Sequence, residues 1–248
     1  MALFFEKDFF IVTGASSGIG KATALLLIKQ GASVVAIGRN KEKLEIAKNE
    51  SIAPERFFIE QEDLILLLEN MPLFLKNLKE KYGKFTGLAY CAGNILFKPA
   101  FSTEYAESLD LFKINYFVPF MMIKAFADKR ICIQNKASVV AISSAASFLK
   151  EKGLSVYNGT KAALQVSLLT LAKEFANKGI RINTISPSDI KTPMTMNETM
   201  QNLRQGREEN YPLGFGEPED CAEMIAFLLS SKAKWITGHD YIIDCASF

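Results

Sequence analysis

Short apolar runs alternate with amphipathic helical patterns along this chain, and this alternation restricts its possible folds more than any other feature. The first run, at residues 9–12, is followed by a helical pattern over 19–29 that ends at Gly31. Further strands are predicted at residues 33–37, 57–60, 86–90, 138–143, 180–185 and 241–243. The alternation predicts an α/β fold, a doubly wound, Rossmann-like parallel sheet of about seven strands with helices on both faces.

Helical patterns fill the segments between these strands, at residues 41–49, 64–82, 103–129, 155–177 and 220–229. Pro72 is expected to interrupt the second of these helices and Pro119 to kink the third. The chain shows neither a linker nor an internal repeat, so residues 1–248 are expected to form a single domain. The irregular stretch at about 192–217 is the best candidate for a lid over a substrate.

The composition excludes several classes of protein. The net charge is only +2, so we expect no strong attraction to nucleic acid or to an anionic membrane. No apolar stretch approaches the roughly 18 residues that span a bilayer, and the N-terminal run is too short and too acidic for a signal peptide. The four cysteines are scattered and His239 is the single histidine, so no metal site and no disulfide framework is predicted. A reducing cytoplasm is the simplest expectation.

A glycine-rich turn joins the first predicted strand to the first helix. Glycine at these positions permits a tight turn and lets a pyrophosphate approach the backbone, where free N–H groups and the helix dipole favour an anion. The spacing is G-x-x-x-G-x-G, which differs from the commonest dinucleotide fingerprint. The residues predicted to hold the cofactor here are Gly14, Ser16, Ser17, Gly18, Ile19 and Gly20.

The end of the second strand bears on the choice between the two nicotinamide cofactors. NAD sites usually place Asp or Glu there to bind the ribose hydroxyls, whereas this chain has Gly38, Arg39 and Asn40. An arginine can pair with a 2′-phosphate. The sequence therefore favours NADP(H) over NAD(H).

Tyr157 and Lys161 lie four residues apart in the helix predicted at 155–177, so they share one helix face. An ordinary phenol has a pKa of about 10. A neighbouring ammonium, with an oxidised nicotinamide close by, is expected to lower that pKa, so that Tyr157 exchanges a proton with a carbonyl or alcohol oxygen. Ser144 lies thirteen residues upstream, at the end of a strand, where its hydroxyl is expected to hold the substrate oxygen.

These motifs resemble the short-chain dehydrogenase/reductase family over essentially the whole chain. Residues 13–20 resemble the family's cofactor turn, and the four catalytic positions of the family correspond to Asn115, Ser144, Tyr157 and Lys161. In the family the asparagine supports a water-linked proton relay through the lysine. The resemblance implies further cofactor contacts at Asp63, Leu64, Cys91, Ala92, Gly93, Pro187, Ile190 and Thr192, besides those of Tyr157 and Lys161.

The resemblance also implies an activity: hydride transfer between a nicotinamide and a carbonyl or alcohol. Family members act on acyl-carrier-protein thioesters, sugars, steroids and small ketones. Among these activities, the resemblance and the chain length favour a 3-oxoacyl-carrier-protein reductase. Substrate choice is expected to depend on residues 145–154 and on the lid, including Tyr211 and Phe215. A homo-oligomer, tetramer or dimer, is expected to form through the helices at 103–129 and 155–177.

Three positions depart from the family pattern. Cys91 replaces the asparagine of Asn-Ala-Gly, Ser188 replaces the glycine of Pro-Gly, and Cys245-Ala246 replaces Gly-Gly after Asp244. None of them removes a catalytic group. They are expected to affect cofactor affinity and loop geometry more than the type of reaction.

Two other functions remain open at this point. Residues 14–18 also match G-x-S-x-G, the nucleophile elbow of α/β-hydrolases, with Ser16, Asp189 or Asp220, and His239 in hydrolase order. The three departures also allow a nucleotide-binding module with little catalysis. The set of Asn115, Ser144, Tyr157 and Lys161 argues against both.

Overall fold

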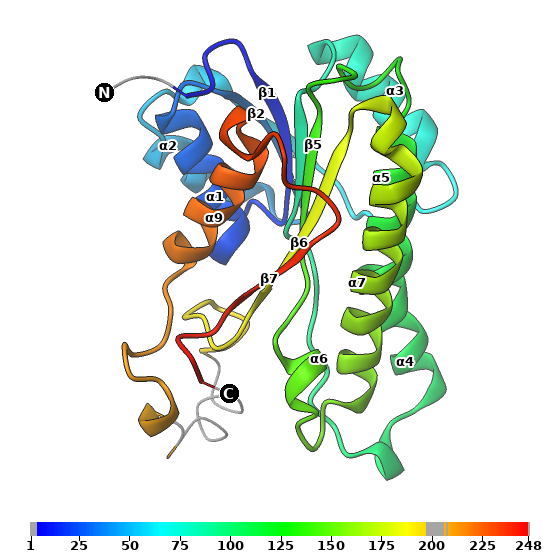
Figure 1. Ribbon diagram of the computed structural model, residues 1–248, viewed down its shortest axis with the longest axis vertical. Helices are drawn as coiled ribbons and strands as arrows, with labels where there is room; N and C mark the ends of the chain where they lie inside the picture. The colour runs from blue at the N-terminus through cyan, green and yellow to red at the C-terminus, as the bar shows by residue number, and fades with distance from the viewer. Residues whose placement is uncertain (1–3, 197–205, 207, 248) are drawn as a thin grey trace.

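A computed structural model describes residues 4–196, 206 and 208–247, and within them a single seven-stranded sheet (Figure 1). The strand order is β3-β2-β1-β4-β5-β6-β7 and every pair is parallel. The predicted doubly wound parallel sheet is confirmed. The strands are β1 (Phe9–Thr13), β2 (Ser33–Gly38), β3 (Phe57–Gln61), β4 (Gly87–Tyr90), β5 (Ser138–Ile142), β6 (Arg181–Pro187) and β7 (Asp240–Ile243).

Helices cover both faces of the sheet, as predicted. Figure 1 shows α1, α2 and α9 on one face and α3, α5 and α7 on the other. The helices are α1 (Gly18–Lys29), α2 (Lys41–Glu50), α3 (Met71–Tyr82), α4 (Tyr105–Phe112), α5 (Val118–Phe126), the short α6 (Ala146–Leu149), α7 (Ser155–Phe175) and α9 (Pro218–Leu229). Helix α6, a single turn after β5, has no counterpart among the helices predicted from the sequence.

The five central strands, β1, β2, β4, β5 and β6, are buried on both faces because their side chains alternate between two cores. In β2, Val35 and Ile37 pack with the helices of the α7 side, whereas Val34 and Ala36 pack with those of the α1 side. All four residues have no exposed surface. A β-branched, apolar run is therefore the expected composition of each central strand.

The helix predicted at residues 64–82 is shorter than expected. Residues 64–70 form turns, and α3 begins only at Met71, with Pro72 in its first turn. Proline lacks an N–H that the first turn does not need, so it is well placed there. Pro72 therefore marks the start of the helix and does not interrupt it.

The helix predicted at residues 103–129 is divided into α4, a π-helical turn at Lys113–Phe117, and α5. Pro119 lies in the first turn of α5. The expected irregularity is present, but it is the π turn that interrupts the α-helical pattern. A π turn inserts one residue and re-aims the side chains around it, and Asn115 lies inside this one.

The carboxyl ends of the strands meet at one edge of the sheet, and the strand order reverses between β1 and β4. In an open parallel sheet this is where ligands bind.

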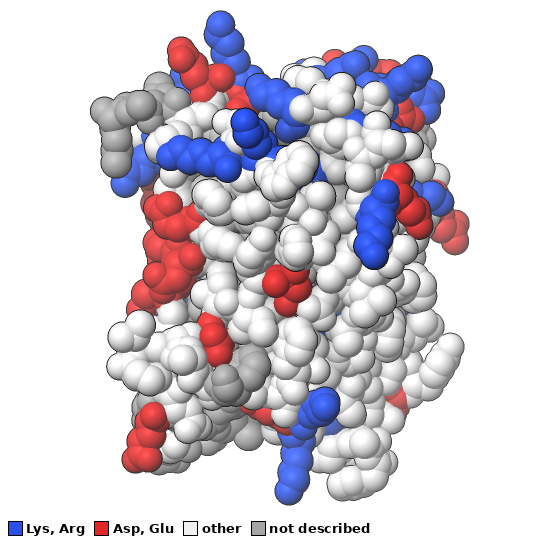
Figure 2. Space-filling model, in the orientation of Figure 1, with Lys and Arg blue, Asp and Glu red and all other residues white. Residues whose placement is uncertain are grey.

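On the face drawn in Figure 2, Lys and Arg gather toward the amino ends of the strands and are sparse at the opposite end. The lid predicted at about 192–217 lies partly outside the described residues, at 197–205 and 207. Among the described residues, no helix combines the length and apolar character that a membrane span requires.

Candidate active site

A cavity of about 420 Å³ opens at the carboxyl edge of the sheet, beside the switch between β1 and β4. Nearly all of the predicted site residues line it. They are Gly14, Ser16, Ser17, Gly18, Ile19, Gly20, Arg39, Asp63, Leu64, Cys91, Ala92, Gly93, Ser144, Tyr157, Lys161, Pro187, Ile190 and Thr192. The exception is Asn115, which is fully buried behind the cavity wall.

The glycine turn between β1 and α1 depends on the absence of side chains. Gly14 and Gly18 have φ angles of +66° and +51°, in the left-handed region that favours glycine. A Cβ on Gly14 would lie 2.9 Å from Ala92 N, and one on Gly20 would collide with the Gly14 carbonyl oxygen. The side chain of Ser17, at the N-cap of α1, makes no capping hydrogen bond. The first N–H groups of α1 are therefore left for an anion in the cavity.

Asn115 connects the π turn to the loop after β4. Its Oδ1 accepts a hydrogen bond from Asn94 N at 2.9 Å, and its Nδ2 donates to Asn94 O at 2.9 Å and to Thr160 Oγ1 at 3.1 Å. A Cβ on Gly93 would lie 3.2 Å from Asn115 Oδ1 and 3.5 Å from Lys161 Nζ. The small residue at position 93 thus allows the amide and the amine to approach the same point.

Tyr157 and Lys161 lie on one face of α7, as predicted, and both are buried, at 8% and 4% exposure. Lys161 Nζ donates to Ile142 O at 2.9 Å, and the Lys161 carbonyl accepts from Ser143 Oγ at 3.1 Å. Burial lowers the pKa of Lys161 to about 8. The amine is therefore mostly protonated at neutral pH but gives up its proton more readily than an ordinary lysine.

The pKa of Tyr157 depends on burial and on Ser144. Burial raises it, and the hydrogen bond with Ser144 opposes that rise only in part. Lys161 Nζ lies 5.8 Å from the centroid of the Tyr157 ring and is directed to the Ile142 carbonyl. In the protein without a nicotinamide, desolvation of the phenol therefore dominates its pKa. The predicted lowering concerns the site with Lys161 and an oxidised nicotinamide together, and it stays a prediction. As a neutral phenol, Tyr157 can donate a proton.

Arg39 and Asp63 lie at the far end of the cavity from Tyr157's helix. The side chain of Arg39 is exposed and has no ion-pair or hydrogen-bond partner among the residues that the structure describes. Its carbonyl accepts from Gln61 Nε2 at 3.2 Å. Asp63 Oδ1 accepts from Ile65 N at 3.0 Å, which fixes the loop after β3. The Arg39 guanidinium is therefore available to an anionic group in the cavity.

Comparison with known proteins now identifies the family. A family model described as enoyl-(acyl carrier protein) reductase matches residues 14–245. The chain belongs to the short-chain dehydrogenase/reductase family. Membership implies a nicotinamide cofactor, and the glycine turn with its uncapped helix start fits the phosphates of such a group.

The relatives of this short-chain dehydrogenase/reductase differ in substrate. The 3-oxoacyl-(acyl-carrier-protein) reductase FabG of Thermotoga maritima is 30% identical over 96% of this chain and 97% of that protein. The NAD-dependent glycerol dehydrogenase of Listeria innocua is 32% identical over 97% of this chain and 96% of that protein. The crystal structure of a short-chain dehydrogenase/reductase (glucose/ribitol dehydrogenase) from Brucella melitensis has a TM-score of 0.91 at 27% identity, covering 100% of this chain and 99% of that chain.

Thr13, the first residue of the cofactor turn, has a role that the sequence did not reveal: it anchors the loop where Cys91 departs from the family pattern. Thr13 Oγ1 accepts hydrogen bonds from Cys91 N at 3.0 Å and Ala92 N at 3.1 Å. Burial raises the pKa of the Cys91 thiol to about 12, so the thiol is neutral. The loop therefore keeps its place through backbone hydrogen bonds that do not depend on the side chain at position 91.

The hydrolase alternative is contradicted by the sheet order. Ser16 follows β1, whereas His239 precedes β7, and β4, β5 and β6 lie between those two strands. With strands about 4.8 Å apart, the separation is on the order of 19 Å, far beyond hydrogen-bond reach. Asp220 instead accepts from Glu217 N at 2.8 Å and caps α9.

No group of three or more metal-ligating side chains occurs in the described part of the chain.

Proposed function

We propose that this protein is a cytoplasmic, NADP(H)-dependent oxidoreductase that interconverts a carbonyl and an alcohol, with Asn115, Ser144, Tyr157 and Lys161 as its catalytic residues. One observation carries the proposal: the Ser144 and Tyr157 hydroxyls, the Lys161 amine and the glycine turn line one cavity, with Asn115 directly behind it. A bound nicotinamide supplies or accepts the hydride at the substrate carbon. The protein supplies orientation and the proton.

Tyr157 is the proton donor in the direction of carbonyl reduction. Its raised pKa keeps the phenol protonated until the substrate oxygen becomes basic, and Ser144, which contacts the phenol, holds that oxygen. Lys161 follows in the relay. Its pKa of about 8 allows it to give up and regain a proton close to neutral pH. Asn115 fixes the neighbouring loop through Asn94 and so holds the end of the relay in place.

Arg39 supports NADP(H) as the preferred cofactor. Within the described part of the chain it is a cation without a partner, and it lies at the end of β2, where an NAD site usually has an acid. One relative is named an NAD-dependent enzyme, so the family does not determine the cofactor and the residue at this position carries the assignment.

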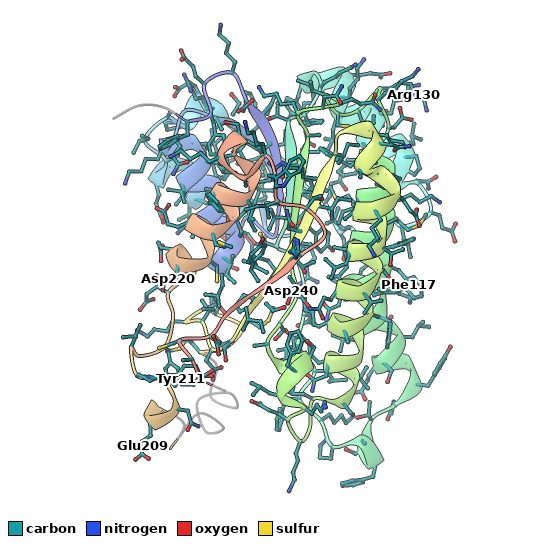
Figure 3. All side chains as sticks on the ribbon, viewed as in Figure 1. Phe117, Arg130, Glu209, Tyr211, Asp220 and Asp240 are labelled. Atoms are coloured by element: carbon teal, nitrogen blue, oxygen red, sulfur yellow. The ribbon has the colours of Figure 1, made fainter. Side chains whose placement is uncertain are left out.

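A 3-oxoacyl-carrier-protein thioester is the substrate that we favour. A relative with that activity in its name covers nearly the whole chain. An apolar cluster beside Tyr157 suits an acyl chain. It contains Leu111 and Leu154, packed against Ile95, Leu96, Phe97, Ala146 and Val156. Of these residues, Ile95, Leu96 and Leu111 line the cavity. The family resemblance further supports assembly into a dimer or tetramer through α4, α5 and α7. Phe117, 40% exposed and labelled in Figure 3, and Val166, 66% exposed, give those helices outward apolar side chains.

The decisive experiment is a panel of carbonyl substrates followed by NADPH absorbance, with NADH in parallel. We expect turnover with NADPH and a higher catalytic efficiency with NADPH than with NADH. The panel includes a 3-oxoacyl thioester, a sugar, a steroid ketone and small ketones. Tight NADPH binding without turnover on any of them would favour a binding module in place of an enzyme.

A further inference from the structure

Beyond the residues that line the cavity, hydroxyl groups tie Tyr211 to the segment that follows β6. The Tyr211 hydroxyl donates to Asp189 Oδ2 at 2.9 Å and lies 2.8 Å from Ser188 Oγ. Ser247 Oγ donates to Ser188 Oγ at 3.4 Å. A hydroxyl donates one hydrogen and accepts another, so a consistent order runs from Ser247 through Ser188 and Tyr211 to the Asp189 carboxylate. Figure 3 shows Tyr211 at this end of the molecule, close to the C-terminus marked in Figure 1.

Tyr211 is suited to be a permanent donor in this network. It is 5% exposed, and its ring packs on Phe215 at a centroid distance of 4.9 Å. Burial raises the pKa of Tyr211 further above its ordinary value, with Asp189 contributing in the same direction. The phenol therefore keeps its proton at neutral pH and the bond to Asp189 persists.

A second anchor holds the same short segment from the C-terminal side. Leu213 N donates to Cys245 Sγ at 3.0 Å. Cys245 and Ala246 have φ angles of +57° and +56°, a conformation that favours the glycines of the family pattern. Cys245 and Ser188 thus stand where the family has glycine, and each provides a side-chain contact to residues 211–213. Both departures from the family pattern therefore tie residues 211–213 to the rest of the protein.

This network reaches the proposed catalytic residues through the backbone. Ala145 N, next to Ser144, donates to Pro187 O at 2.9 Å, so the start of the β6 loop is tied to the end of β5. Pro187, Ser188, Ile190 and Thr192 line the cavity, whereas Tyr211 does not. Any effect of Tyr211 on the reaction must therefore pass through the segment at 187–192.

We infer that Tyr211 is a positioning residue: through Ser188 and Asp189 it holds the segment at 187–192 against Ser144, and so fixes the place of the substrate carbonyl relative to Tyr157. The inference rests on the proposed function. The segment forms the cavity wall on the side of β6 and meets the glycine turn at Thr192, whose Cγ2 would lie 3.1 Å from a Cβ on Gly18. Small displacements of such a wall reduce the fraction of complexes aligned for transfer.

The test compares Tyr211→Phe, Ser188→Gly and the double variant. Tyr211→Phe removes only the hydroxyl, so the ring packing on Phe215 is kept. We expect kcat to fall about tenfold. The dissociation constant of NADPH should rise by less than that, because only the cofactor contacts predicted at 187–192 shift, whereas Arg39 and the φ angles of the glycine turn do not depend on Tyr211. If both residues act through one hydrogen bond, the double variant loses no more activity than the stronger single variant. Full additivity of the two losses, or a kcat for Tyr211→Phe within twofold of the parent, would overturn the inference.

Tyr82→Phe is the matched control. Tyr82 also donates to a carboxylate, Glu60 Oε1, at 2.6 Å, but near the edge strand β3 and away from the cavity. The Tyr82→Phe variant should lose about as much stability as Tyr211→Phe does, and its kcat should stay that of the parent. If Tyr82→Phe lowers kcat as much as Tyr211→Phe does, the effect of the latter is general destabilisation and the inference fails.

Hydrogen exchange with NADPH bound separates this inference from the proposed function. In Tyr211→Phe we expect faster exchange of the amides of residues 188–192, with unchanged exchange in α1. Unchanged exchange at 188–192 would contradict the positioning role even for an active enzyme. If the parent protein turns over no carbonyl substrate, the proposed function fails while the exchange result still decides whether Tyr211 holds this segment.

Discussion

The two sides of the cavity are built in different ways. On the side of β1 and α1, backbone groups and missing side chains make the site: Gly14, Gly18 and Gly20 leave room, and the start of α1 supplies N–H donors. On the side of β5, α7 and β6, side chains make it, through the Ser144–Tyr157 contact and the Ser188 hydroxyl, which is hydrogen-bonded to Tyr211 outside the cavity. We therefore expect substitutions that enlarge a residue to be harmful on the first side, and substitutions that remove a polar group to be harmful on the second.

The largest effect is expected from Tyr157→Phe. The loss of the proton donor should lower kcat about 10³-fold, with the dissociation constant of NADPH nearly unchanged because the phosphates bind on the other side. Stopped-flow turnover and fluorescence titration with NADPH measure the two quantities. Substantial remaining turnover would remove Tyr157 from its assigned role.

Gly20→Ala tests the backbone-built side. The added Cβ would collide with the Gly14 carbonyl oxygen, so the turn must shift, at a cost of about 1–3 kcal/mol in the free energy of unfolding. NADPH binding should weaken in parallel. Gly159→Ala is the control, since a Cβ there has only Phe112 Cζ within 4.0 Å, and it should stabilise α7 by about 0.5–1 kcal/mol. Equal effects of the two substitutions on chemical denaturation and on NADPH binding would show that the turn is not close-packed.

Arg39→Asp tests whether one side chain on the same side selects the cofactor. Replacing a cation with an anion should raise the KM for NADPH tenfold to hundredfold, through loss of a charge-assisted contact worth about 1.5–3 kcal/mol. The KM for NADH should stay the same or fall. Steady-state kinetics with both cofactors provide the measurement, and unchanged NADPH kinetics would contradict the preference for NADP(H).

Lys161→Met should remove activity yet stabilise the fold at neutral pH. The pKa of Lys161 is lowered from 10.5 to about 8, so the unfolded chain binds more protons than the folded protein between those values. The free-energy cost of burying the charged amine therefore destabilises the folded protein fully below pH 8. This cost disappears as pH rises toward 10.5. The variant should gain on the order of 1–2 kcal/mol at pH 7 after the loss of the bond to Ile142 O.

Urea denaturation of Lys161→Met at several pH values checks this prediction. The advantage of the variant over the parent should shrink above pH 8. The exposed Lys124 provides the comparison, because Lys124→Met should change stability by no more than about 0.5 kcal/mol at any of these pH values. A Lys161 variant that is less stable than the parent at pH 7 would show that the amine stabilises the fold.

Local patterns predicted most of the fold and of the site because the residues concerned act through short-range geometry. Tyr157 and Lys161 share a helix face whatever surrounds them, and the glycine spacing at 14–20 requires a turn in any context. The predictions failed where two alternatives were locally similar. Pro72 can end or begin a helix, and the π turn around Asn115 keeps a helical pattern while adding one residue.

The sequence by itself determined the alternation of strands and helices, the cofactor turn and the candidates Ser144, Tyr157 and Lys161, since each follows from spacing along the chain. Asn115 came from the resemblance to the family. Only the tertiary structure decided that Thr13 holds the loop at Cys91, that burial raises the pKa of Tyr157, and that Ser188 and Cys245 both contact residues 211–213. The physical reason is that desolvation and hydrogen bonding depend on neighbours in space, and these neighbours lie tens of residues apart in the chain.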